Sequence, residues 1–468
     1  MSSTSIAWLR NDLRLTDNPA LTAALRSGNP VVAVYIHEKT SGVRPPGAAA
    51  RWWLHRSLKM LGAALAEGGI GLVVRDGDAV TVLPALVAEL GARSVFWNRR
   101  YAPGERDADA TIMSQLRHNG ITVQSFAANL LVEPWDIATG QGKPYSVFTP
   151  FWKTLREMPI ATPLRRPDSG KASAHTPVDS GYRNPPWSRR LAPHWVIGEA
   201  AAQERLVAFL DERLDNYAQG RDFPGHNATS QLSPHLRFGE ISARQVWHAA
   251  QAIAHADHRR QAAVDKFLSE LAWRDFSYHQ LYHRVDIAKV PMQPKYAEMA
   301  WRHADADLVA WQQGRTGLPI IDAGMRELWE TGYMQNRVRM LAASLLTKNL
   351  LIDWQLGEQW FWDCLVDADV ANNPAGWQWV AGCGLDAAPY FRVFNPVTQG
   401  ERFDGRGDYV RRWVPELAAL PDEWIHRPAE APRDVLGKAS VTIGETYPAP
   451  IVDLKTSRVR ALEAASGL

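Results

Sequence analysis

The chain has 468 residues, of which 46% are hydrophobic and 22% charged, and its 52 basic and 50 acidic residues give a net charge of +2. These proportions exclude a disordered or collagen-like chain and indicate a globular protein with a core. The apolar runs are shorter than the roughly 20 residues of a membrane span, and no signal peptide is visible. The two cysteines, Cys364 and Cys383, are too few for a disulfide framework or a typical zinc site, so we expect a cytoplasmic protein.

Short β-rich runs alternate with helical patterns through residues 1–130. The strands are expected at Ser5–Arg10, Pro30–His37, Gly71–Arg75, Ser94–Arg99 and Ile121–Phe126, and the helices at Pro19–Arg26, Ala49–Glu67, Ala79–Leu90 and Glu105–His118. This alternation predicts a Rossmann-like α/β domain with a parallel five-stranded sheet. No GxGxxG motif follows the first strand, so a dinucleotide held in the usual Rossmann manner is not expected there.

A connection is predicted over residues 131–198, because residues 161–193 are rich in Pro, Ser, Gly and Arg without periodicity. Residues 199–468 are predicted to form an all-α domain. Its helix candidates are Ala200–Gln219, Ala243–Ala254, Ala262–Tyr282, Ala304–Gln313, Ile320–Thr331, Asn336–Leu350 and Gly357–Ala368.

Tryptophan is unusually frequent, with 20 residues, nine of them between Trp273 and Trp379. Indoles are bulky and need a partner for their N–H when they are buried. Composition alone indicates that these tryptophans fill a helical core, and it does not by itself assign them a functional role.

Residues 269–276 place Glu270, Trp273 and Arg274 on one face of a predicted helix. A carboxylate, an indole and a guanidinium on one stripe suit a polar site, but a surface ion pair beside a tryptophan fits as well. Farther along, Asn336 and Met340 are four residues apart and face the same way. They suit the edge and face of a planar ligand, while an N-cap Asn followed by a core Met is the simpler interpretation.

Two further segments carry polar clusters. Residues 366–379 contain an Asp pair, Asp367 and Asp369, which can accept hydrogen bonds from hydroxyl groups or pair with an arginine such as Arg339. In residues 227–239, hydroxyl groups stand just before a helix, as in a phosphate site or in an ordinary helix cap.

In this order, the four segments resemble the photolyase/cryptochrome family. The stretches WLRNDLRLTDNPAL near the start, TGLPIIDAGMREL at 316–328 and DAAPYFRVFNPVTQGERFD at 386–404 extend the resemblance over nearly the whole chain. It implies an α/β antenna domain and a helical FAD-binding domain. Within the family the chain is most similar to bacterial photolyases of class I or class III, which repair cyclobutane pyrimidine dimers (CPDs).

The resemblance implies a set of FAD contacts: Tyr217, Thr229, Ser230, Gln231, Leu232, Ser233, Trp273, Arg274, Asn336, Asp367, Asp369 and Asn373. Asn373 would lie beside the reactive ring nitrogen. Plant-type photoreceptors of the family carry Asp there, and a carboxylate would repel an anionic reduced flavin, so Asn373 favours the DNA-repair branch. Phe267 and Tyr333 stand where Trp is frequent in class I members.

By the same resemblance, the lesion pocket comprises Glu270, Trp273, Asn336, Met340 and Trp379. The branch that repairs (6-4) photoproducts has a His pair near positions 336 and 340, and the DASH branch usually has Gln at 340. Asn336 and Met340 differ from both patterns and therefore weigh against these two branches. Glu270 would bond the dimer, either protonated, which burial makes possible, or through an adjacent proton.

Three more groups of residues are implied. Trp377, Trp354 and Trp301 match the family's electron-transfer chain. Contacts to phosphates of UV-damaged DNA are expected from Arg221, Arg337 and Arg392, with Gln399 nearby. Glu105 would bind an antenna chromophore, either methenyltetrahydrofolate or 8-hydroxydeazaflavin, although it is equally placed as a first-turn helix acid.

The resemblance leaves one main alternative, a blue-light receptor of the cryptochrome type. That function would predict a C-terminal extension, which the sequence does not show, and Asp at position 373. A generic flavin oxidoreductase would need a nicotinamide site, for which no motif is present. We expect a monomer that needs no protein partner and no membrane.

Overall fold

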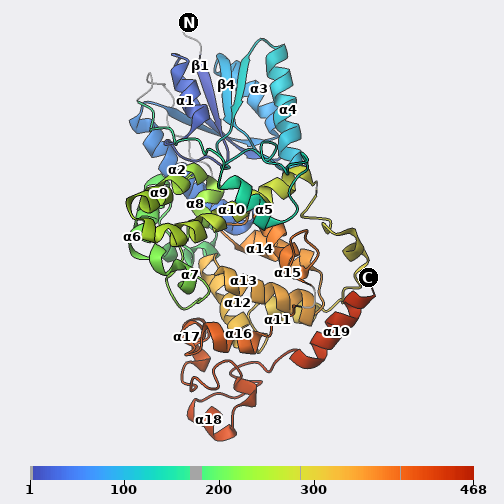
Figure 1. The fold of residues 1–468 in the computed structure, drawn as a ribbon. Helices are drawn as coiled ribbons and strands as arrows, with labels where there is room; N and C mark the ends of the chain where they lie inside the picture. Colours follow the sequence, from blue (N-terminus) through green and yellow to red (C-terminus); the bar gives the residue numbers. More distant parts are fainter. Residues whose placement is uncertain (1–3, 169–181, 285, 390–391, 468) are drawn as a thin grey trace.

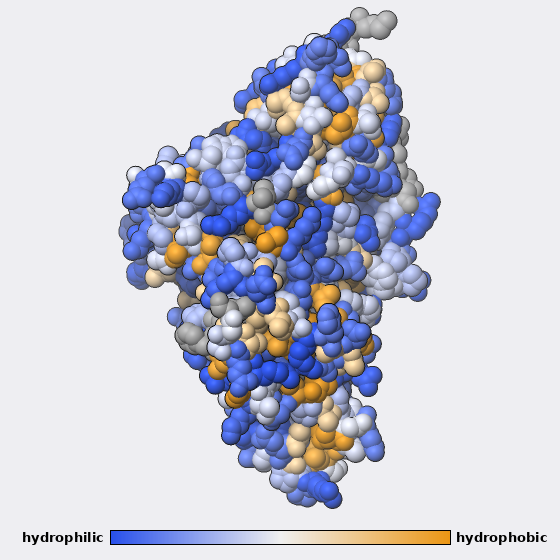
Figure 2. Space-filling model, turned by 90° about the vertical axis from the view of Figure 1, so that its right-hand side faces the viewer, coloured by the Kyte–Doolittle hydropathy of each residue, from blue (hydrophilic) through white to orange (hydrophobic). Residues whose placement is uncertain are grey.

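The computed structural model describes residues 4–168, 182–284, 286–389 and 392–467. An α/β unit forms one end of the molecule and a larger helical unit the other (Figure 1). Within the described ranges, no helix is both long and apolar enough to cross a membrane. The face drawn in Figure 2 is mainly hydrophilic, with apolar residues in small groups.

The α/β unit is built on a five-stranded sheet whose described pairings are all parallel. Its strands are β1 (Thr4–Leu9), β2 (Val31–Glu38), β3 (Gly71–Gly77), β4 (Ala92–Asn98) and β5 (Thr122–Phe126), in the order β3-β2-β1-β4-β5. The central strand β1 is almost wholly buried, as expected for a parallel sheet covered on both faces. Each strand matches the sequence prediction to within two residues.

Helices cover both faces of the sheet. These helices are α1 (Pro19–Arg26), α2 (Ala48–Glu67), α3 (Ala79–Glu89) and α4 (Pro103–His118). Ala7 and Leu9 of β1 share a core with α1 and α2, whereas Ile6 and Trp8 share a core with α3 and α4. Since successive strand residues point to opposite faces, the two cores lie on opposite sides of the sheet.

The helical unit contains fourteen described α-helices from residue 199 onward. They are α6 (Glu199–Glu212), α7 (Tyr217–Gly220), α8 (Ser233–Phe238), α9 (Ala243–Ala256), α10 (Gln261–His283), α11 (Asp305–Gln312), α12 (Pro319–Thr331), α13 (Asn336–Ser344), α14 (Trp354–Cys364), α15 (Asn372–Ala381), α16 (Pro396–Phe403), α17 (Asp408–Trp413), α18 (Arg433–Lys438) and α19 (Leu454–Ser466).

Three of the predicted helices differ from the observed ones. The pattern at 200–219 is interrupted after α6 by a 3-10 turn over Leu214–Asn216. Arg260 donates to Asp215 of this turn and to Leu210 O of α6. The helix predicted over 336–350 is shorter in the structure. α13 ends at Ser344, and the chain continues as a π-helical turn over Leu345–Asn349. α14 starts three residues earlier than predicted, because Asp353 caps it, and it ends four residues earlier, at Cys364.

The predicted connection contains a packed helix, α5 (Phe148–Leu155). Phe148, Phe151 and Leu155 belong to the same apolar core as Phe276 of α10. The first part of the 131–198 segment therefore contributes to the helical core. The middle of the Pro- and Ser-rich stretch, residues 169–181, lies outside the described residues.

The two units are joined by buried polar contacts at the end of α8. Arg14, 1% exposed, donates to the carbonyl oxygens of Gly239 at 2.9 Å and of Ala128 at 3.2 Å. Gly239 has a φ of +66°, and a Cβ on it would collide with the carbonyl of Asn11. A glycine is needed here both for the left-handed backbone and for the close approach of the two units.

We expect Gly239→Ala to lower the free energy of unfolding by more than about 2 kcal/mol, because it adds left-handed strain and overpacking. The matched control is Gly437→Ala in α18, where a Cβ meets only open space, so that variant should be neutral or slightly stabilising. Thermal unfolding of both variants measures the difference. Equal melting temperatures would contradict this account of the interface.

Candidate active site

A cavity of about 680 Å³ opens in the helical unit, within the size range of ligand pockets. Eighteen of the predicted site residues line it: Tyr217, Arg221, Thr229, Ser230, Gln231, Leu232, Ser233, Glu270, Trp273, Arg274, Asn336, Arg337, Met340, Asp367, Asp369, Asn373, Trp377 and Trp379. The two positions where Trp is frequent in class I members, Phe267 and Tyr333, line it as well.

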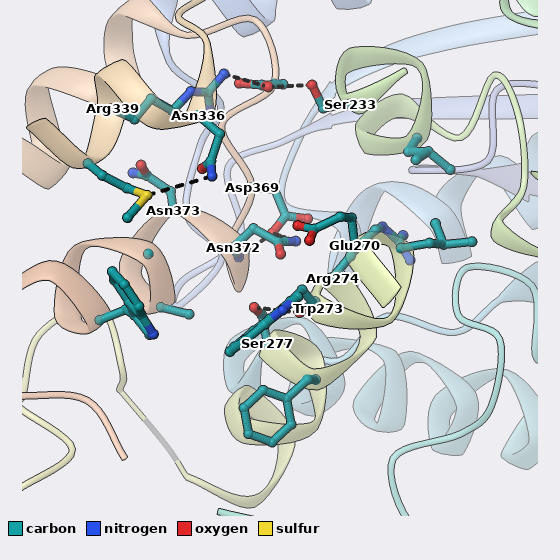
Figure 3. Close-up of a pocket in the computed structure, with 18 of the residues that line it drawn as sticks. Ser233, Glu270, Trp273, Arg274, Ser277, Asn336, Arg339, Asp369, Asn372 and Asn373 are labelled. Carbon is teal, nitrogen blue, oxygen red and sulfur yellow. Dashed lines mark hydrogen bonds and ion pairs between the residues drawn. The ribbon is translucent and has the colours of Figure 1, made fainter. Parts of the chain in front are cut away.

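The α10 face predicted from the sequence forms one wall of the cavity. Glu270, Trp273 and Arg274 lie together on this helix (Figure 3). Trp273 is stacked on Phe148 of α5, with ring centroids 3.8 Å apart and planes 11° from parallel. This stacking fixes the tilt of the indole and makes it a rigid aromatic surface at the cavity wall.

Glu270 is held as a carboxylate by two cations. It accepts from Arg221 at 2.9 Å and from Lys266, four residues earlier on α10, at 2.7 Å. Burial alone would raise the pKa of Glu270, but hydrogen bonds and charges from Arg221 and Lys266 outweigh it and lower the pKa. Of the two alternatives given for Glu270, the lowered pKa favours an adjacent proton, such as those on Arg221 and Lys266, over a protonated carboxyl.

A buried carboxylate, Asp367, joins two walls of the cavity. Its Oδ2 accepts from Ser233 Oγ at 2.6 Å and from Arg339 at 2.8 Å (Figure 3). The pairing with Arg339 that the sequence suggested is thus present. Among the described residues, Oδ1 of Asp367 is buried without a hydrogen-bond partner, which suits a hydroxyl or amine donor of a ligand.

Asp369 and Asn373 shape the start of α15. Asp369 accepts from Tyr278 Oη at 2.5 Å and from the N–H groups of Ala371 at 2.9 Å and Asn372 at 2.6 Å. The Asn373 amide donates through Nδ2 to Oε1 of Glu358 at 2.8 Å. The first turn of α15 is therefore fixed by two acids, Asp369 in the cavity wall and Glu358, which does not line the cavity.

The opposite wall begins with α13. Asn336 and Met340 share one face of this helix, with Nδ2 3.8 Å from Sδ (Figure 3). Gln335, not Asn336, is the N-cap, since its side chain accepts from the N–H groups of Arg337 and Val338. The simpler interpretation of Asn336 as a cap is therefore wrong, and its exposed amide is available to a ligand.

The predicted DNA-contacting residues are not all at the cavity. Arg221 and Arg337 line it, and Arg337 pairs with Asp222 at 2.8 Å. Arg392 is exposed and Gln399 is half-buried on α16, and neither lines the cavity.

Three contributors to the site were missed by sequence reasoning. Lys266 pairs with Glu270 on one helix, and its i,i+4 spacing was a readable signal. Asp222, the partner of Arg337, and Glu358, the partner of Asn373, are remote in sequence from the residues they hold. No local pattern marks either of them.

The three tryptophans of the predicted chain differ in exposure. Trp377 lines the cavity at 3% exposure, Trp354 is 2% exposed at the start of α14, and Trp301 is half-buried. Gly357 lets the Trp377 ring approach α14, because a Cβ there would collide with it. Next to Trp301, the N–H of Arg302 donates to Leu351 O at 2.7 Å, so the Trp301 segment runs beside the loop that leads into Trp354.

Glu105 occupies the first turn of α4, as its alternative interpretation had it. It is buried and accepts from the N–H of Ala102 at 3.2 Å. Burial raises the pKa of this carboxyl, against the opposing charge of Arg100. A chromophore contact from Glu105 stays a prediction.

Two family models match this chain: DNA photolyase over residues 5–168, and the FAD binding domain of DNA photolyase over residues 267–467. A deoxyribodipyrimidine photo-lyase of Agrobacterium fabrum is 48% identical over 98% of this chain and 97% of its own length. The chain belongs to the DNA photolyase family. The resemblance inferred from the motifs, the predicted fold class and the predicted enzyme class are confirmed.

Other members of the family match over the whole chain. Cryptochrome-1 of Arabidopsis thaliana is 37% identical over 99% of this chain and 70% of its own length. A crystal structure of a bacterial class III photolyase from Agrobacterium tumefaciens has a TM-score of 0.95 and 46% identity, covering 100% of this chain and 98% of its own.

The ion pairs of Glu270 predict a pH dependence of stability. A carboxyl whose pKa is lowered on folding stabilises the protein above its unfolded pKa, and this contribution is lost as pH falls through the folded value. Wild type should therefore lose more stability between pH 7 and pH 4 than Glu270→Gln does. Unfolding in urea at both pH values measures this, with Glu204→Gln on the exposed face of α6 as control. Equal losses in wild type and Glu270→Gln would contradict the pairing.

Proposed function

We propose that this protein repairs cyclobutane pyrimidine dimers in DNA in a light-dependent reaction that uses reduced FAD. One observation carries the proposal: a single cavity is lined both by the polar set expected to hold FAD and by Glu270, Trp273, Asn336 and Met340. The relatives named deoxyribodipyrimidine photo-lyase support it.

The cavity fits FAD in the character of its polar groups. The free Oδ1 of Asp367 can accept from a ribityl hydroxyl, and Arg274 can bind phosphate. When bound, reduced FAD supplies a photoexcitable donor of single electrons, and this chemistry belongs to the cofactor. The residues of this chain would bind FAD and the damaged DNA, orient them toward each other and keep water out of the cavity.

The walls of the cavity would hold a flipped dimer. Trp273 and Trp379 offer aromatic faces, and base–aromatic stacking is worth about 1–3 kcal/mol per base. Asn336 bonds a base edge, while Glu270 accepts from an imide N–H. Flipping normally costs a few kcal/mol, less for a lesion that is already poorly stacked.

Of the two proton sources left open for Glu270, a protonated carboxyl or an adjacent proton, we propose the adjacent one, carried by its two cations. Arg221 and Lys266 both bond the Glu270 carboxylate, and their remaining N–H groups can donate to a carbonyl oxygen of the dimer. Negative charge that develops on that carbonyl would meet two fixed positive charges.

Binding to the DNA backbone would be electrostatic and independent of the DNA sequence. Arg221, Arg337 and Arg392, with Gln399, are proposed to contact phosphates that flank the lesion. Arg221 and Arg337 pair with Glu270 and Asp222, so phosphate would bond the N–H groups that these carboxylates leave free.

Blue-light signalling is the second candidate function, because Cryptochrome-1 also matches over the whole chain. Asn373 favours repair, since an amide tolerates an anionic reduced flavin better than a carboxylate does. We further propose a monomeric, cytoplasmic protein with a second chromophore, methenyltetrahydrofolate or 8-hydroxydeazaflavin, in the α/β unit.

The repair activity is tested by illuminating the FAD-loaded, reduced protein with CPD-containing DNA and, separately, with (6-4)-containing DNA. Recovery of monomeric thymines only from the CPD substrate is expected. Glu270→Gln should bind lesion DNA to within about threefold of wild type but repair it with a roughly tenfold lower yield, as for the loss of one charged hydrogen bond. Absence of CPD repair in the wild type would reject the proposal in favour of signalling.

The tryptophan chain is tested by Trp377→Phe. Photoreduction of oxidised, bound FAD should be lost, because phenylalanine is much harder to oxidise, while chemically pre-reduced protein should still repair. Trp329→Phe, which changes an exposed indole of α12, is the control and should photoreduce normally. Normal photoreduction in Trp377→Phe would remove Trp377 from the pathway.

A further inference from the structure

A segment of the α/β unit reaches the back of the active site. Arg44, between β2 and α2, forms a two-pronged ion pair with Glu358 of α14, with N–O distances of 2.7 and 2.8 Å. Glu358 is 1% exposed. The guanidinium of Arg44 also lies 3.8 Å from the ring centroid of Trp362, one turn along the same helix.

The backbone around Arg44 is fixed to α14. The indole N–H of Trp362 donates to Pro45 O at 3.0 Å, and the N–H of Ala48 donates to Asp363 at 2.8 Å. A Cβ on Gly47 would collide with the carbonyl of Trp362. Arg44 is therefore placed by several contacts at once, and its fork meets Glu358 with little freedom to move.

Glu358 in turn orients Asn373. The Asn373 Nδ2 donates to Oε1 of Glu358 at 2.8 Å and to its backbone O at 3.0 Å. A carboxylate and a carbonyl can only accept, so the amide must turn its NH₂ group toward them. The Oδ1 oxygen is then the atom that Asn373 can offer to the cavity it lines.

We propose that Arg44 is a positioning residue that acts through Glu358 to hold the oxygen of Asn373 toward the cofactor edge. This inference rests on the proposed function, since it takes FAD to be the occupant of the cavity. Reduced flavin carries a hydrogen on its reactive ring nitrogen, whereas oxidised flavin offers only a lone pair there. A fixed acceptor therefore favours the reduced form over the oxidised form.

Without Arg44, the buried carboxyl of Glu358 would lose its cation. The two-pronged contact that holds the carboxyl group in place would be lost with it. Without a fixed acceptor at Glu358, the amide of Asn373 is free to turn its NH₂ group to the cavity instead. The preference for the reduced cofactor would then be lost.

The test is the midpoint potential of bound FAD in Arg44→Gln, measured by anaerobic reductive titration. We expect the preference for the reduced form to fall about tenfold, which corresponds to the loss of one hydrogen bond. For a two-electron couple, this makes the midpoint potential about 30 mV more negative. Arg44→Lys keeps the positive charge but not the two-pronged contact with Glu358, so it should shift the midpoint potential less than Arg44→Gln does. Arg75→Gln, which removes an exposed pair with Glu89, is the control and should match wild type.

A purely structural role for Arg44 gives a different result. It would lower the melting temperature and FAD occupancy of Arg44→Gln but leave the potential of the bound FAD at the wild-type value, and that outcome overturns the proposal. If Arg44→Gln does not fold, Glu358→Gln replaces it, with the same expected direction and the same overturning result.

A second readout does not need the cofactor. The Asn373 side-chain amide protons, assigned in ¹⁵N-Asn-labelled protein by their loss in Asn373→Ser, should exchange with solvent about tenfold faster in Arg44→Gln than in wild type, for the loss of about 1.4 kcal/mol of hydrogen bonding. Unchanged exchange overturns the inference even if the protein takes up no FAD. Failure of wild type to bind FAD, in contrast, rejects the proposed function.

Discussion

The carboxylate of Asp367 is the contact on which the shape of the site depends. It bonds Ser233 at the start of α8 and Arg339 of α13, and it lies just before α15. Three segments that are far apart in sequence therefore meet at one buried charge. Removing one partner of such a pair leaves the other uncompensated, which is far more destabilising than losing an exposed pair. The cavity is thus held open by a polar anchor and not by apolar packing alone.

The α/β unit contributes to this site without lining it. Among the described residues, those that line the cavity all fall between Tyr217 and Asp386, yet Arg14 holds the end of α8 and Arg44 holds α14. Both contacts lie behind the cavity walls and set where those walls stand. A change in the first fifty residues can therefore alter chemistry in the helical unit without touching a ligand.

The sequence was informative where spacing along one element decides the geometry. The five strands, the shared face of Glu270 and Trp273, and the pairing of Asn336 with Met340 all follow from period and offset. It was uninformative where a partner comes from a distant segment. The pKa of Glu270 depends on Arg221, which lies 49 residues away. The four polar segments gained meaning only jointly, through their resemblance to one family.

The stack of Phe148 on Trp273 bears on how the polypeptide could be divided. Helix α5 belongs physically to the catalytic half, although it precedes the Pro- and Ser-rich stretch. If the chain were divided after residue 130, α5 would stay in the same fragment as Trp273. If it were divided after residue 160, α5 and Trp273 would be in different fragments. Complementation between separately expressed fragments should thus favour the earlier junction.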